Sequence, residues 1–164
     1  MKKLLFSVLA VIMIVSNTGC TNKSSVVTPI TTGLSFTAQI GFNDTKTECK
    51  TVIEKDGKTT FTVMAPAEIN GLTFVFSDGK ATANYKGLEY NFSGELAEYN
   101  AVNMVYKVLE NADKNSVIAK DDAYVVRGNI NNIDYVLQLG ATGLPIKITA
   151  ENGLEVIIKN ATIM

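Results

Sequence analysis

Apolar and polar residues alternate with a period of two through most of the chain after residue 34. In one segment Leu72, Phe74 and Phe76 share one side, and Thr73 and Ser77 take the other. This pattern predicts β-strands with one apolar face and one polar face. The predicted strands are 35–43, 46–55, 59–66, 72–77, 80–86, 88–93, 117–130 (broken or bulged), 133–140, 145–151 and 154–163.

Short turn signals separate these strands. The dipeptides Asp56-Gly57, Asp78-Gly79 and Asn152-Gly153 predict type I′ turns, in which both central residues have positive φ. Lys86-Gly87 and Asn131-Asn132 are weaker signals of the same kind. Because short turns join neighbouring antiparallel strands, about ten strands in a meandering sheet are expected.

One segment, residues 95–114, has the period of a helix instead. Its apolar positions recur at spacings of three and four: Leu96, Tyr99, Val102, Tyr106 and Leu109. Ser93 is a plausible N-cap. Further apolar residues, including Met104 and Val105, widen the apolar stripe, so the helix should be covered on more than one side.

The sizes of sheet and helix predict the architecture. About ten strands spaced roughly 4.8 Å apart make a sheet about 48 Å wide, whereas a helix of about 18 residues is roughly 27 Å long and 10 Å across. The sheet must therefore curl around the helix, giving a mainly β fold with one helix (α+β), a curved antiparallel half-barrel. Its concave side either keeps a cavity or fills with its own side chains.

The beginning of the chain predicts export and anchoring. Two lysines precede residues 4–15, a run of 12 residues in which only Ser7 is polar, and Thr18-Gly19-Cys20 follows. The run is too short to span a bilayer and has the layout of a secretory signal peptide. Its end resembles a bacterial lipobox, whose cysteine receives acyl chains such as palmitate. We therefore expect a signal peptide over 1–19, a lipidated Cys20 with a flexible tether over 20–34, and the β domain over 35–164.

Composition and charge narrow the function. The chain has no His, which excludes catalysis by imidazole and zinc sites that need imidazole ligands. Its 15 basic and 16 acidic residues give no basic surface for nucleic acid. Asp121-Asp122 is read as a solvated turn, and Asn129, Asn131 and Asp134 as a loop rather than a calcium site. Arg127, the only Arg, is either a surface charge or an anchor for an anionic head group. No enzyme activity, cofactor or metal is expected.

Cys49 is the only cysteine besides Cys20. The alternative to lipidation is a disulfide between these two residues in an oxidising compartment. If Cys20 carries lipid, Cys49 has no partner and is expected to be an inert strand residue.

The complete layout resembles the LolA/LolB-like lipoprotein carriers and their relatives. The shared features are the lipobox, a short tether, antiparallel strands with one apolar face, a helix after the sixth strand and a final group of hairpins. The segment 63–74 also resembles uncharacterised lipoproteins of Gram-positive anaerobes with this domain. The resemblance implies an incomplete barrel that binds acyl chains in its apolar interior.

Two functions follow from these features. The first is a membrane-anchored extracytoplasmic lipoprotein that binds a lipid or other hydrophobic ligand in the curved sheet. The residues expected to line that site are Leu72, Phe74, Phe76, Leu88, Tyr90, Phe92, Val102, Val105 and Leu109. The alternative is a cell-envelope sensor or structural interaction lipoprotein with a filled barrel. Expected partners are the membrane, through Cys20, and a hydrophobic small molecule or lipid, with no nucleic acid.

Overall fold

The computed structural model describes residues 27–92, 101–120 and 123–164. Within these ranges the chain forms strands, the helix α2 (Ala101–Asn111), and the short 3-10 helices η2 (Ala67–Ile69) and η4 (Ala112–Lys114). The strands are β1 (Leu34–Phe42), β2 (Thr45–Ile53), β3 (Thr59–Ala65), β4 (Thr73–Ser77), β5 (Lys80–Tyr85), β6 (Leu88–Phe92), β7 (Val117–Lys120), β8 (Ala123–Ile130), β9 (Ile133–Leu139), β10 (Pro145–Ala150) and β11 (Glu155–Ile163).

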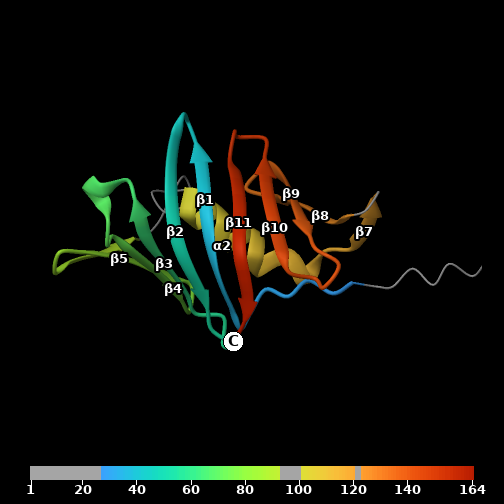
Figure 1. Cartoon of the computed structure of the whole chain (residues 1–164), viewed down its shortest axis with the longest axis horizontal. Helices are drawn as coiled ribbons and strands as arrows, with labels where there is room; N and C mark the ends of the chain where they lie inside the picture. Colours follow the sequence, from blue (N-terminus) through green and yellow to red (C-terminus); the bar gives the residue numbers. More distant parts are fainter. Residues whose placement is uncertain (1–26, 93–100, 121–122) are drawn as a thin grey trace, which may run out of the picture.

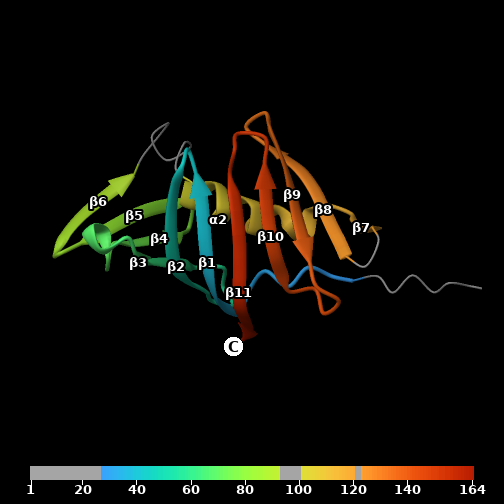
Figure 2. The same ribbon diagram turned by 45° about the horizontal axis from the view of Figure 1, so that its top comes forward.

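The strands form one open, curved antiparallel sheet of 11 strands, which confirms the predicted half-barrel (Figures 1 and 2). Their order is β6-β5-β4-β3-β2-β1-β11-β10-β9-β8-β7. The chain therefore begins at the centre of the sheet, runs outward to the edge strand β6, and returns from the opposite edge, β7, to end beside β1. Because α2 lies between β6 and β7 in the sequence, it belongs to the connection between the two edges.

Two-residue turns join several strand pairs. Asp78 and Gly79 have φ of 51° and 71°, which confirms the predicted type I′ turn. Both residues of the Lys86-Gly87 and Asn131-Asn132 turns also have positive φ. In the Asn43-Asp44 turn, which joins β1 to β2, φ is also positive at both residues.

The other two predicted type I′ turns are wrong in type. In Asp56-Gly57 and Asn152-Gly153 only the glycine has positive φ. In the first of them, the Gly57 N–H donates to the Glu54 carbonyl and the Glu54 N–H donates to the Lys58 carbonyl. These are longer hairpin loops, in which a type I turn is followed by a residue in the left-handed conformation. Glycine adopts this conformation without strain.

The helix α2 lies on the concave side of the sheet and contacts β1 and β8 (Figure 2). Of the predicted helix 95–114, residues 101–111 are α-helical and 112–114 continue as η4, while 95–100 and Ser93 lie outside the described residues. Its buried residues include four consecutive positions, 102–105, which face different directions around the helix axis. The expected burial on more than one side is thus confirmed.

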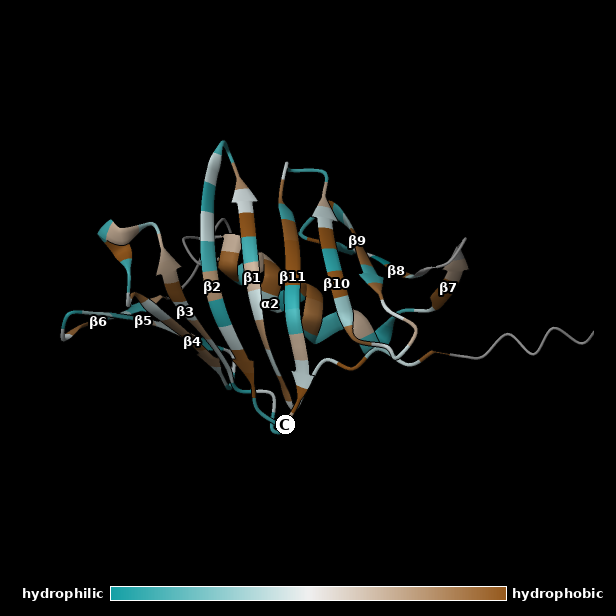
Figure 3. Cartoon of the chain, viewed as in Figure 1, coloured by the Kyte–Doolittle hydropathy of each residue, from teal (hydrophilic) through white to brown (hydrophobic). Residues whose placement is uncertain are grey.

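The core lies between α2 and the concave face. Alternate residues of the strands are buried in it, and brown and teal bands alternate along several of these strands in Figure 3. On β1 the buried set is Leu34, Phe36, Ala38 and Ile40, and on β9 it is Tyr135, Leu137 and Leu139. The period-two pattern in the sequence therefore identifies the concave face correctly across these strands.

The segment 117–130, which was predicted to be broken or bulged, is broken into β7 and β8, and these two strands pair with each other, with Val117 opposite Val126. Strict alternation predicts that Ile146 and Ile148 share the buried face of their strand, opposite Lys147. This prediction is wrong for Ile146, because the register of β10 shifts between Pro145 and Lys147, so that Ile146 lies at a bulge and is exposed. A bulge adds one residue to a strand, so the side chains before it lie on the face opposite to the one that strict alternation predicts.

Residues 27–33 precede β1 and run along the domain. The Ile30 N–H donates to the Gly143 carbonyl at 2.9 Å, and the Ile30 side chain contacts the core. This part of the predicted tether is therefore in contact with the domain. In the part of the chain that the structure describes, no helix is long and apolar enough to cross a membrane.

Candidate functional site

The strands β4–β6 form the wing, one end of the sheet, and their apolar face continues the concave face. The strand register places Phe74, Ala83 and Tyr90 in one row across the wing. It places Phe76, Ala81 and Phe92 in the next row. Directly opposed residues of antiparallel strands point to the same face. All six side chains therefore share one face of the wing.

Contacts of Phe76 show that this face is the concave one. Phe76 is only 4% exposed and stacks on Tyr106 of α2, with ring centroids 4.6 Å apart and ring planes 10° apart. It also meets Phe61 of β3 edge to face at 5.8 Å. Phe76 thus marks the boundary between the wing and the covered region. The covered region is the strands β1–β3 and β8–β11, whose concave side chains are mostly buried.

Burial decreases outward along the wing. Beyond Phe76, the Phe92 ring lies 6.2 Å from Phe74 and 5.0 Å from Tyr90. Tyr90 is 57% exposed and Leu88 is 77% exposed. Since Leu88 and Tyr90 are exposed together on one face, the outer wing has an apolar surface that is open to solvent.

The nine residues expected to line a ligand site divide into three groups. Four are buried in the core: Phe76, Val102, Val105 and Leu109. Three are half-buried, namely Leu72, Phe74 and Phe92, and two are exposed, namely Leu88 and Tyr90. The predicted lining residues of β4 and β6 therefore lie together on the wing, whereas the three predicted lining residues of the helix belong to the core.

The opposite face of the wing is polar. Thr82 lies opposite Asn91 there, and its hydroxyl donates to the Asn91 side-chain oxygen at 3.0 Å. Asn84 lies opposite Glu89 in the neighbouring row. The wing is therefore amphipathic, with its apolar side on the concave face.

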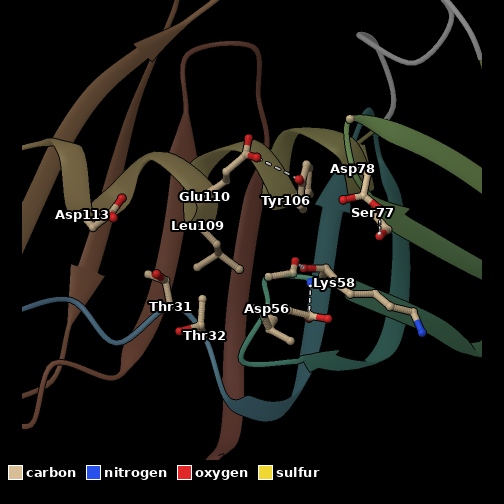
Figure 4. Close-up of a pocket in the computed structure, with 14 residues that line it drawn as sticks. Thr31, Thr32, Asp56, Lys58, Ser77, Asp78, Tyr106, Leu109, Glu110 and Asp113 are labelled. Atoms are coloured by element: carbon tan, nitrogen blue, oxygen red, sulfur yellow. Dashed lines mark hydrogen bonds between the residues drawn. The ribbon is translucent and has the colours of Figure 1, made fainter.

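A pocket of about 400 Å³ lies beside α2 at the junction of the covered region and the wing (Figure 4). Acidic side chains from three separate segments line it: Asp56, Asp78, Glu110 and Asp113. Sequence reasoning treated the first two only as turn residues and did not identify this pocket. No short-range sequence signal joins positions 56, 78 and 110, because only the tertiary fold brings them together.

Tyr106 connects this pocket to the wing. Its hydroxyl donates to Glu110 Oε1 at 2.9 Å, while its ring stacks on Phe76. Burial, followed by the hydrogen bond and the charge of Glu110, raises the pKa of Tyr106 to about 12. The phenol therefore stays protonated at physiological pH and is a hydrogen-bond donor rather than a base.

Other candidate residues have structural surroundings. Asn129 bonds the Asp134 carboxylate and accepts from the Asn132 N–H, so this group organises the β8–β9 turn. Among the described residues no group of three or more His, Cys, Asp or Glu is placed to hold a metal. Asp121-Asp122 lies outside the described residues. Arg127 lines a separate pocket, of about 420 Å³, whose lining also includes Asp134 and Glu151.

Cys49 is fully buried in β2, opposite Ala38 of β1 and Val63 of β3. Burial, with a smaller contribution from Glu48, raises the pKa of its thiol to about 11. A neutral, inaccessible thiol is a poor nucleophile. This agrees with the expectation of an inert strand residue. Cys20 lies outside the described residues.

Comparison with known proteins gives structural similarities only. No protein-family model matches the chain, and no curated protein matches it. A LolA superfamily protein from Nitrosomonas europaea has a TM-score of 0.46 and 8% identity, over 80% of this chain and 84% of that one. A DUF1329 family protein from Desulfovibrio piger ATCC 29098 has a TM-score of 0.41 and 10% identity, over 80% and 86%. PNGF-II has a TM-score of 0.41 and 10% identity, over 80% of this chain and 27% of that chain.

Proposed function

We propose that this chain is a membrane-anchored extracytoplasmic lipoprotein of LolA/LolB-like layout that binds a lipid or other hydrophobic ligand on the concave face of the wing. One observation carries the proposal. The apolar face that is buried at Phe76 continues outward to Tyr90 and Leu88, where it is open to solvent. The protein acts by burial of apolar surface and needs no catalytic group.

The dimensions of the outer wing suit an acyl chain. The five residues of β6 span about 17 Å along the strand. One acyl chain is about 15 Å long, half the roughly 30 Å thickness of a bilayer's hydrocarbon core. Complete burial of a large apolar side chain contributes about 1.5–3 kcal/mol. Covering Leu88 and Tyr90 therefore contributes at most about 3–6 kcal/mol toward binding of a hydrophobic ligand.

The membrane anchor in this proposal is the lipidated Cys20, on the extracytoplasmic side. The position of Cys49 supports it, because a fully buried thiol in the middle of β2 is a poor partner for a disulfide with the start of the chain. Acylation of Cys20 leaves Cys49 as an ordinary core residue.

The test is to identify lipid that leaves the purified protein without breaking a covalent bond. The full-length protein is purified from the membrane of the cells that make it and extracted with organic solvent. Acyl groups on Cys20 stay with the protein, and bound ligand enters the solvent for mass spectrometry. We expect extractable lipid in a reproducible ratio to protein, and repeated empty preparations contradict the proposal.

A pair of matched variants assigns the ligand to the wing. Leu88→Ser with Tyr90→Ser removes the two exposed contacts and is expected to reduce extractable lipid at least about tenfold. Ile118→Ser with Ile157→Ser is the control, because these residues are also exposed and apolar but lie on the convex face. Equal loss in both variants contradicts binding at the wing.

The packing under α2 favours a second candidate, an envelope sensor or structural interaction lipoprotein. Val105 and Val108 of the helix are fully buried against the sheet, so this part of the interior is filled by the protein's own side chains. Such a protein works through its convex face or loops. Co-purification of one stoichiometric envelope protein, together with empty preparations of the chain, distinguishes this function from ligand binding.

A further inference from the structure

We propose that two copies of the chain pair edge to edge through β6, antiparallel, about a two-fold axis that passes beside Tyr90. This inference goes beyond ligand binding, because it names a second copy of the chain as a partner. Among the described strands, β6 has β5 as its only neighbour in the sheet. Its other edge is available to a further strand.

The turn between β5 and β6 sets the hydrogen-bond phase of the edge. Lys86 and Gly87 have φ of 49° and 83°, the signature of a two-residue type I′ turn. Tyr85 lies opposite Leu88 and closes this turn. In a two-residue hairpin the closing pair exchanges both backbone hydrogen bonds.

Alternation along the ladder then assigns the remaining residues of β6. Leu88, Tyr90 and Phe92 direct their backbone groups toward β5, because hydrogen-bonded and non-bonded pairs alternate. Glu89 and Asn91 therefore direct their N–H and C=O groups toward the free edge. The edge presents two donors and two acceptors at defined positions.

Only one symmetric register pairs all the outward-facing backbone groups of β6 with those of a second β6 and keeps the Glu89 carboxylates of the two copies apart. When Tyr90 of each copy lies on the axis, Glu89 of one copy opposes Asn91 of the other, and both such pairs form two hydrogen bonds each. A register centred on Glu89 places two carboxylates directly opposite each other, which is destabilising. The sequence of β6 is thus self-complementary around Tyr90.

This register also covers the exposed side chains. Leu88 of one copy lies beside Phe92 of the other, and the two Tyr90 side chains are neighbours on the concave face. The two wings then form one continuous apolar surface. A pair of five-residue strands buries less than the roughly 1,200–2,000 Å² of a standard interface, so the dimer is weak and depends on concentration.

The two edges of the sheet differ in a way that supports the choice of β6. The opposite edge strand, β7, has four residues and ends with Lys120, a residue type that discourages edge pairing. The strand β6 has neither Lys nor Pro in its five residues. Glu89 is the only charged residue of β6.

Cysteine cross-linking in the membrane of cells that make the full chain tests this register. Residues on the axis form a non-bonded pair with Cα atoms about 4.5 Å apart, close enough for a disulfide. Under mild oxidation we expect Tyr90→Cys to give a disulfide-linked dimer. Leu88→Cys is the matched control, because Leu88 is more exposed than Tyr90 but its two copies lie about 14 Å apart in this register. Equal cross-linking of both variants, or none of Tyr90→Cys above the unsubstituted chain, overturns the proposal.

Substitutions at Asn91 separate this proposal from ligand binding. Within the Tyr90→Cys chain, Asn91→Pro removes an edge donor without changing the concave side chains, and is expected to abolish the cross-link. Asn91→Ala, which loses only the Thr82 contact, should retain it. The amount of lipid extracted from the Asn91→Pro protein should be unchanged. The cross-link therefore tests edge pairing and the extracted lipid tests ligand binding, so either proposal can fail while the other stands. An undiminished cross-link in Asn91→Pro contradicts edge pairing.

Charge variants give a second, opposite-signed readout. Asn91→Asp places like charges opposite Glu89 in both pairs, and Asn91→Lys places opposite charges there. Each cross-strand pair contributes roughly 0.2–1 kcal/mol, so two pairs shift the cross-linked fraction of Tyr90→Cys about two- to thirty-fold, down for Asp and up for Lys. Identical cross-linking by the two variants overturns the register.

Discussion

The covered region and the wing have the same alternating pattern but different surroundings. In the covered region, Leu137 of β9 is completely buried, whereas Leu88 of β6 is 77% exposed. Both residues point to the concave face of one sheet. The difference is the distance from α2, which packs on β1 and β8 and stacks Tyr106 on Phe76 at the inner side of the wing.

This contrast separates two kinds of information. Alternation identifies which face of a strand is apolar, because it depends on local spacing alone. Whether that face is covered depends on where a distant element lies. The covered region stabilises the fold, whereas the wing leaves apolar side chains exposed.

The largest expected effect is the contrast between two identical truncations. Leu137→Ala should lower the free energy of unfolding by about 2–5 kcal/mol, because it leaves a cavity in the core. Leu88→Ala should change it by less than about 0.5 kcal/mol, because the side chain is mostly in water. Urea unfolding of the purified protein measures both, and similar losses at the two sites contradict the division.

A backbone contact in the covered region gives the next effect. A side chain at Gly128 would overlap the buried ring of Tyr135, whose hydroxyl accepts from Asn115. Gly128→Ala should therefore cost about 1–3 kcal/mol of unfolding free energy. At Gly41 the nearest atom is 3.5 Å away, so Gly41→Ala is the control with the smaller loss. Equal midpoints of thermal unfolding for the two variants would show that the Tyr135 ring moves freely.

A polar group in the covered region should show the opposite sign. The Thr51 hydroxyl is buried on β2 and has no hydrogen-bond partner among the described residues. Thr51→Val removes this unsatisfied group at nearly constant volume and should raise the unfolding free energy by about 1 kcal/mol. Thr82→Val on the polar face of the wing loses its bond to Asn91 and should give no gain. A less stable Thr51→Val protein contradicts the assignment.

Alkaline pH tests the boundary between the two regions. The pKa of Tyr106 is raised from 10.0 to about 12 in the folded protein, so the native state holds its proton more tightly than the unfolded state. The resulting contribution of Tyr106 to the free energy of unfolding is fully present below pH 10 and is lost as the pH rises toward 12. Cys49, with a pKa of about 11, adds a loss between about pH 9 and 11. Tyr106→Phe should make unfolding stability less dependent on pH above 10, and an unchanged slope contradicts the burial of this phenol.

Most of the fold was predictable from the sequence because its signals are local. Period-two patterns and the turns at Asp78-Gly79 and Lys86-Gly87 identified the strands and their antiparallel pairing. The type of turn at Asp56-Gly57 was wrong, because a glycine with positive φ occurs in more than one hairpin loop. The bulge beside Ile146 was missed, because a register shift has no distinct sequence signal there.

The candidate site was only partly predictable. The apolar face of Leu88 and Tyr90 follows from alternation, but their exposure does not, because it depends on how far α2 extends over the sheet. The acidic pocket was missed for the related reason that Asp56, Asp78 and Glu110 lie far apart in the sequence. Sequence patterns describe faces, and tertiary contacts decide which faces remain open.

The most direct test of ligand binding at the wing is to map where an acyl chain lies. Cells that make the full chain are fed a fatty acid with a photoreactive group in its hydrocarbon tail, then irradiated, and the cross-linked peptides are identified by mass spectrometry. We expect non-covalently held probe to label the segment that contains Leu88 and Tyr90. Labelling confined to convex positions such as Ile118 and Ile157, or absent from the domain, would contradict the central claim.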